Sequence, residues 1–293
     1  MKKRIISVLL AVLMLMSASI SCYADSENAR AVMGAQTLES EEQTNIVYTA
    51  FGIERGSVKE LTVTNAEERA YLEGYVDSAL IGSRSVSCVY VELLPEGSGM
   101  DVSTANITWC TPEMYMAALA TAGITDAKVI VASPFEVSGT AALTGVYKAY
   151  EDITGMKLDD LAKLVSTQEL TITGELAEEI GNMDSTGIVN DLKLMLDETV
   201  NMTDDQLRSE IKAIAAQYNV SLTESQINQL IELCRSLEGL DADALKERVE
   251  EVQGTLKKVS DAKTKVVGFV DKAKKVVTSV KSFFEKIKDI IGL

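Results

Sequence analysis

The stretch that decides the fold is residues 85–132, SVSCVYVELLPEGSGMDVSTANITWCTPEMYMAALATAGITDAKVIVA. Residues 85–94 are rich in Val and Tyr, the composition of a β-strand. Pro, Gly and Ser dominate residues 95–99 as in a turn, and residues 102–109 have a second strand pattern. We therefore predict that the two strands pair as a hairpin across this turn.

A helix and a further strand follow. Residues 111–113, TPE, supply a capping hydroxyl, a proline suited to the first helical position and an acid beside the positive end of the helix dipole. Gly123 ends this helix, and residues 127–132 form the next apolar strand. Another helix is predicted over residues 138–150.

The residues before this stretch add a helix, a strand and a second helix. Ser40 and Gln43 have the spacing of a capping box, which begins a helix that ends near Gly52. Residues 58–64 alternate in polarity as a strand does. A helix capped by Asn65 follows and reaches to about residue 80.

From residue 58 onward the predicted order of elements is β-α-β-β-α-β. That order is typical of the ferredoxin-like, or split βαβ, unit, so we predict an α+β fold with an α/β domain over residues 25–155. The strand pattern then almost disappears, and capping boxes at Thr203 and Thr223 begin helices with apolar residues at helical spacing. Residues 156–239 are therefore predicted to form a helical domain.

Residues 240–293 are predicted to form one basic amphipathic helix. Fourteen positions alternate spacings of four and three, and thirteen of them are apolar, which is the pattern of a coiled-coil seam. We expect residues 240–265 to pack on the rest of the protein, and residues 266–293 to detach and bind an anionic surface. Folding back entirely and pairing with another helix are the alternatives. The seam positions are 245, 249, 252, 256, 259, 263, 266, 270, 273, 277, 280, 284, 287 and 291. The candidate surface-binding residues are Lys272, Lys274, Lys275, Lys281, Phe283, Phe284, Lys286 and Lys288.

Residues 1–24 have the composition of a cleavable secretory signal. A basic start precedes an apolar run of about 12 residues, which is shorter than the roughly 20 needed to span a bilayer. Cys22 and Ala24 are both small, which predicts cleavage after Ala24. We therefore expect a secreted, extracellular protein, which includes the case of a protein attached to the cell envelope. A short membrane anchor is one alternative. Acylation of Cys22 is another, although Ser19 stands where a lipoprotein motif has a large aliphatic residue.

The net charge of −16 is unevenly distributed. Residues 25–254 hold 40 acidic and 15 basic side chains, a net charge of −25, whereas residues 255–293 carry a net +6. Such an acidic body repels nucleic acid, so no nucleic-acid partner is predicted. The absence of His excludes His-based acid–base catalysis and His-ligated zinc. The cysteines lack CxxC spacing, and we predict neither a metal site nor a cofactor.

Several segments together resemble a known family. They are ITWCTPEMY at residues 107–115, TAGITDA at 121–127, VSGTAALTG at 137–145 and MGA at 33–35. These resemble the YpuA-like family of exported proteins from Gram-positive bacteria, domain of unknown function 1002, over about residues 32–240. The resemblance implies a secreted protein and supports the α/β interpretation. It brings no assigned activity, so no catalytic residue is carried over.

The remaining candidate site residues lie near the predicted sheet. Ser138, Gly139 and Thr140 have the composition of an anion nest at a helix N-terminus. A simple Ser cap, followed by small residues that let the helix pack against the sheet, is the favoured interpretation. Cys88 and Cys110 fall on the same face of the predicted hairpin when residue 88 lies opposite residue 108. They become direct neighbours, able to form a disulfide, only if the turn shifts by one residue.

No residue pattern identifies a catalytic group. The charge distribution favours a non-enzymatic binding or interaction protein, whose cationic helix binds an anionic membrane, a cell-wall surface or a partner helix. The alternative is an extracellular hydrolase that acts on cell-wall polymer with two carboxylates. Pairs such as Glu175 and Glu179 are better explained as solvated helix faces. Trp109, Tyr90 and Tyr115 are candidates for a stacking platform, although aromatic residues near a sheet are more often core.

Overall fold

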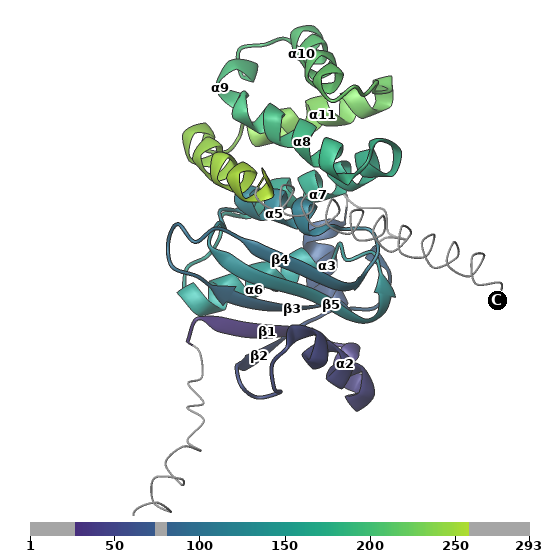
Figure 1. Cartoon of the computed structure of the whole chain (residues 1–293), viewed down its shortest axis with the longest axis vertical. Helices are drawn as coiled ribbons and strands as arrows, with labels where there is room; N and C mark the ends of the chain where they lie inside the picture. The colour runs from purple at the N-terminus through teal and green to yellow at the C-terminus, as the bar shows by residue number, and fades with distance from the viewer. Residues whose placement is uncertain (1–26, 74–80, 258–293) are drawn as a thin grey trace, which may run out of the picture.

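The computed structural model describes residues 27–73 and 81–257, which form a five-stranded sheet with helices on both faces (Figure 1). The strands lie in the order β2-β1-β3-β5-β4. The β1/β2 and β4/β5 pairs are parallel, whereas β1/β3 and β3/β5 are antiparallel. The fold is therefore α+β with a mixed sheet. The strands are Ala29–Gly34 (β1), Lys59–Val63 (β2), Cys88–Leu93 (β3), Asp101–Ile107 (β4) and Ala127–Val137 (β5).

The predicted hairpin between residues 85–94 and 102–109 is wrong. The β5 strand lies between β3 and β4 and pairs with both. The connection from β3 to β4 crosses the start of β5, where Leu94 N–H donates to Asp126 O at 3.0 Å and Gly99 N–H donates to Asp126 Oδ1 at 2.8 Å. The turn residues do reverse the chain direction, as predicted. The connection spans the width of one strand, however, so β3 and β4 do not pair with each other and β5 lies between them.

The β1 strand has no counterpart among the predicted elements. Its sequence, ARAVMG, is buried along almost its whole length, so it lacks the polar–apolar alternation that reveals a half-exposed strand. Because β1 lies between β2 and β3, the strand order is not that of a ferredoxin-like sheet, and that part of the prediction is wrong. At the end of β1 the chain needs glycine, since a Cβ on Gly34 would lie 2.5 Å from Ser85 O.

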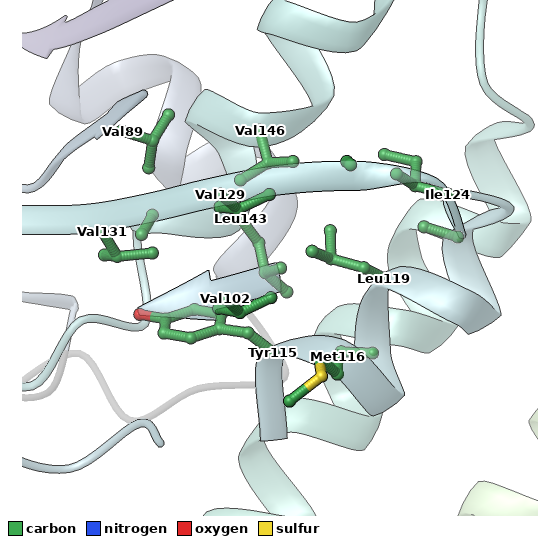
Figure 2. Close-up of a cluster of buried hydrophobic side chains, with 14 of the residues drawn as sticks. Val89, Val102, Tyr115, Met116, Leu119, Ile124, Val129, Val131, Leu143 and Val146 are labelled. Atoms are coloured by element: carbon green, nitrogen blue, oxygen red, sulfur yellow. The ribbon is translucent and has the colours of Figure 1, made fainter. Parts of the chain in front are cut away.

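Alternate residues of the strands form two cores, one on each face of the sheet. The first lies under α2 (Glu41–Phe51), which contributes Val47, Tyr48 and Phe51. The second lies under α5 (Pro112–Ala122) and α6 (Ala142–Thr154), where Figure 2 shows Val89, Val129 and Leu143 in one apolar cluster. Each fully buried aliphatic side chain stabilises the fold by about 1.5–3 kcal/mol, so both faces contribute.

The helix-start signals are confirmed at α2, α5, α10 (Asp204–Gln217) and α11 (Glu224–Leu237), where Ser40, Thr111, Thr203 and Thr223 accept the expected backbone hydrogen bonds. In α3 (Asn65–Leu72) the cap is Thr64 rather than Asn65. The α6 helix begins at Ala142 rather than at residue 138. The boundaries differ where several hydroxyl or amide residues precede a helix and each is a plausible cap.

The helical half is centred on α7 (Asp160–Ile180), which contacts α5 and α8 (Asn182–Leu194). In Figure 1, α8, α9 (Leu196–Thr199), α10 and α11 stand above the sheet, and they share a third apolar core with α7. Trp109 joins the halves: its indole Nε1 donates to Glu178 Oε1 at 2.7 Å, and its ring lies against Gly174, where a Cβ would be 2.2 Å from the ring.

Candidate functional site

Residues 242–257 form a helix that packs against both halves of the protein. Its seam positions are buried as expected: Leu245 and Val249 join the helical core, and Val252 and Leu256 join the core of the sheet. Lys257, at the end of the described part of this helix, is exposed. The candidate surface-binding lysines and phenylalanines, the signal peptide and Cys22 lie outside the described residues.

A cleft of about 610 Å³ lies beside this helix. One wall is a face of α8 that includes Thr186, Gly187 and Asn190, and the other is the helix 242–257, with Gln253 and Gly254. Tyr218, which follows α10, and Glu113, in the first turn of α5, also line the cleft. The volume lies within the range of small-molecule sites. The cleft therefore brings together residues separated by more than a hundred positions in the chain.

Two polar side chains on the α8 wall are buried, each only 1% exposed: Thr186 and Asn190. Thr186 Oγ1 and Asn190 Oδ1 have no hydrogen-bond partner within the described part of the chain. An unpaired buried polar atom costs about 1–3 kcal/mol, so a ligand that satisfied both would recover that cost.

A neighbouring carboxylate, Asp191, is held by the rest of the cleft. Tyr218 OH donates to Asp191 Oδ2 at 2.7 Å, and Gln253 Nε2 donates to Asp191 Oδ1 at 3.3 Å. Burial, followed by the hydrogen bond to Asp191, raises the pKa of Tyr218, so the phenol stays protonated and keeps donating. Gly187 positions the phenol, because a Cβ there would lie 2.6 Å from the Tyr218 ring.

Two residues of the predicted anion nest, Ser138 and Thr140, line a second, smaller cleft of about 330 Å³ together with Arg84. Ser138 Oγ and Thr140 Oγ1 lie 3.5 Å apart. The N-cap of α6 is Ala141, so the interpretation of Ser138 as the helix cap is wrong. Gly139 has a structural role: its φ is +94°, and a Cβ would lie 2.6 Å from the hydroxyl oxygen of Tyr115.

Glu68 is a buried carboxyl group that the sequence pattern did not reveal. The capping box of α3 is completed by its neighbour Glu67, together with Thr64. Glu68 instead accepts hydrogen bonds from Ser85 Oγ and Asn65 Nδ2. Burial raises its pKa to about 7, although both hydrogen bonds oppose the shift.

An ion pair between Lys193 and Glu169 is enclosed where α5, α7 and α8 meet. Lys193 Nζ lies 2.8 Å from Glu169 Oε1 and donates to Ala117 O at 3.0 Å. Thr121 Oγ1 donates to the other oxygen of Glu169. Burial raises the pKa of Glu169 and lowers that of Lys193, whereas their contact favours both charges. The side chains of Lys193 and Glu169 are 0% and 1% exposed and line neither of the two clefts described above, so their role is structural.

Cys88 and Cys110 are free thiols in the structure, and the sheet separates them. Cys88 belongs to the core under α2, whereas Cys110 belongs to the core under α5 and α6. The even spacing that put both on one face assumed a direct β3–β4 hairpin, which does not form. Cys234 is likewise a buried free thiol, as expected.

The other candidate groups have structural partners. Glu175 and Glu179 accept hydrogen bonds from Gln229 and Gln226, at 2.6 and 2.9 Å, and so join α7 to α11. The candidate stacking platform does not form, since Tyr90 and Tyr115 lie in different cores and Trp109 packs on α7. No helix within residues 27–73 and 81–257 is both long and apolar enough to cross a bilayer. Those residues also hold no acidic or cysteine cluster arranged for a metal ion.

Comparison with known proteins connects this fold to a family. The family model described as protein of unknown function, DUF1002, matches residues 33–259. The uncharacterized protein YpuA of Bacillus subtilis (strain 168) is 39% identical over 232 residues, which are 79% of this chain and 78% of that protein. No solved structure matches the chain. Both the family model and the relative span most of the chain, and the protein therefore belongs to the DUF1002 family.

Proposed function

We propose that the protein is exported and binds an anionic envelope surface through residues 258–293, which we call the basic segment, without acting as an enzyme. The observation that carries this proposal is the docking of the preceding helix. Leu245, Val249, Val252 and Leu256 are buried, so the body holds the helix firmly. Lys257 is exposed where the basic segment begins.

The charge distribution supports the same role. The basic segment contains nine Lys against four acidic residues, whereas residues 25–254 carry a net charge of −25. An anionic surface therefore repels the body and attracts the basic segment. Each Lys near an anionic lipid surface contributes about 1 kcal/mol, and Phe283 and Phe284 would add apolar contact. The docked helix 242–257 connects the acidic body to the basic segment.

Co-sedimentation of the chain beginning at residue 25 with vesicles tests the proposal. We expect binding to phosphatidylcholine vesicles that contain phosphatidylglycerol, no binding without it, and loss of binding at high salt. Replacement of Lys272, Lys274 and Lys275 by Gln should weaken binding about a hundredfold, because three contributions of about 1 kcal/mol are lost. The matched control replaces three lysines of the body by Gln, which should leave binding unchanged: Lys157, Lys212 and Lys246.

Two other surfaces give different results in the same assay. Purified cell wall that pellets the protein, when the vesicles do not, would identify anionic wall polymer as the surface. Concentration-dependent self-association in sedimentation, with no binding to vesicles or wall at low salt, would replace the proposal with a partner helix. No binding to any of them at low salt would refute surface attachment.

A further inference from the structure

The cleft between α8 and the helix 242–257 has a chemistry of its own, separate from surface attachment. We propose that it binds a small ligand that carries a primary ammonium group on a short apolar body. The cleft has the volume of a small-molecule site, and polar side chains of α8 form one of its walls.

The polar groups of the cleft are mainly hydrogen-bond acceptors. Thr186 Oγ1 and Asn190 Oδ1 are buried and unpaired among the described residues, and they lie one helical turn apart on α8. The Asp191 carboxylate follows Asn190 and lines the same cleft. A primary ammonium has three N–H donors and no acceptor, so it can satisfy all three groups at once. The hydrogen bonds to Asp191 would be charge-assisted, which makes them the strongest of the set.

The charge of the lining selects a cation. Glu113, Asp191 and Glu250 line the cleft, whereas Lys257 is the one basic residue among its described lining residues. The apolar lining consists of Met183, Leu256 and the Tyr218 ring. An ammonium on a short alkyl chain therefore matches both parts of the cleft, whereas an anion would face a net negative lining.

Asp191 is positioned before any ligand arrives. Tyr218 OH and Gln253 Nε2 each donate to one of its oxygens, at 2.7 and 3.3 Å, from two different elements. A carboxylate oxygen accepts more than one hydrogen bond, so both oxygens retain capacity for a ligand donor. A group held in this way loses little conformational freedom on binding.

Isothermal titration of the chain beginning at residue 25 tests the site, with 1,4-diaminobutane as the probe and 1,4-butanediol as its uncharged counterpart. We expect saturable 1:1 binding of the diamine and at least about tenfold weaker binding of the diol. Asp191→Asn should weaken diamine binding about tenfold or more, because a charge-assisted hydrogen bond is lost. Glu232→Gln makes the same charge change on an exposed part of α11 and should leave binding unchanged.

Asn190→Leu separates a binding role from a structural one. The substitution removes a buried side-chain oxygen that has no partner in the described chain, so it should leave the unfolding midpoint unchanged or raise it. It should nevertheless weaken diamine binding about tenfold. A lower midpoint together with unchanged binding would show that Asn190 only supports the fold, and would overturn its part in the site.

Other outcomes would overturn the proposal as a whole. These are equal affinity for diamine and diol, no saturable binding of either, or unchanged binding in Asp191→Asn. Stronger diamine binding after Lys258, Lys263 and Lys265 are replaced by Gln would identify the chain's own lysines as the occupant, in place of a free ligand. Vesicle binding by Asp191→Asn stays at the level of the unsubstituted chain if the two sites are independent, so failure of one proposal leaves the other standing.

Discussion

The enclosed ion pair predicts that the junction of α5, α7 and α8 depends strongly on one lysine. Lys193→Met removes the cation and leaves the Glu169 carboxylate with only the Thr121 hydroxyl as a donor. Lys193 and Glu169 are 0% and 1% exposed, so water cannot replace the lost partner. Breaking a buried pair from one side costs about 3–5 kcal/mol, and we expect a loss of this size.

The double substitution Glu169→Leu with Lys193→Met provides the decisive comparison. Both charges are then absent, and the Thr121 hydroxyl, which no longer has Glu169 as its acceptor, can donate to Ala117 O instead. No buried polar group is left without a partner, so the double variant should recover most of the stability lost by either single variant. Replacing a buried pair by apolar residues of similar volume is often neutral or stabilising.

Urea unfolding followed by circular dichroism measures these differences. The control is Lys212→Met, which breaks an exposed pair with Glu224 and should leave the unfolding midpoint unchanged. A loss below about 1 kcal/mol for Lys193→Met would refute the reasoning, because the junction must then admit water. A double variant less stable than both single variants would also refute it.

Three further predictions concern other buried groups. Glu68→Gln should flatten the pH dependence of the unfolding free energy: burial raises the pKa of Glu68 from 4.5 to about 7, so the folded chain retains a proton that the unfolded chain loses. The protonated Glu68 side chain stabilises the fold by up to about 3 kcal/mol below about pH 4.5, and this contribution is lost as the pH rises to about 7. Urea titrations across that pH range compare the unsubstituted protein with Glu68→Gln. Gly174→Ala should destabilise the protein by about 1–3 kcal/mol and shift the fluorescence of Trp109, because the new methyl group displaces the indole. The control is Gly254→Ala, whose methyl group would meet no atom within 4 Å and which should stabilise the protein by up to about 1 kcal/mol. A thiol reagent should label none of Cys88, Cys110 and Cys234 in the folded chain beginning at residue 25 and all three after unfolding. The reason is that burial raises each thiol pKa to about 11 or 12. Labelling of the folded chain, or a disulfide found by mass analysis, would contradict this prediction.

The predicted elements that hold in the structure depend on contacts between near neighbours in the chain. Ser40, Thr111, Thr203 and Thr223 each accept a hydrogen bond from a backbone N–H three residues later, and Gly123 ends α5 with a positive φ. The seam from Leu245 to Leu256 is buried because its residues share one helix face. Such contacts join residues three or four positions apart, so the pattern that produces them can be read directly in the sequence.

The candidate cleft could not be predicted in the same way. Thr186 and Asn190 are ordinary polar residues on a helix, and their spacing suits a solvated face equally well. They line a cleft only because α8, α5 and the helix 242–257 meet there, although the helix 242–257 comes about sixty residues later in the chain than α8. The pairing of Lys193 with Glu169 likewise arises only from the packing of α8 against α7, and no local pattern distinguishes them from surface charges.

The sequence by itself determined the class of the fold, the starts of most helices, the contrast between an acidic body and a basic segment, and the family. Each of these depends on composition or on residues a few positions apart. The tertiary structure alone decided that β1 enters the sheet, that β5 separates β3 from β4, and that Cys88 and Cys110 lie on opposite faces. The physical reason is that strands pair through backbone groups, which every residue carries, so the choice of partner is settled by how whole layers pack rather than by the residues of one strand.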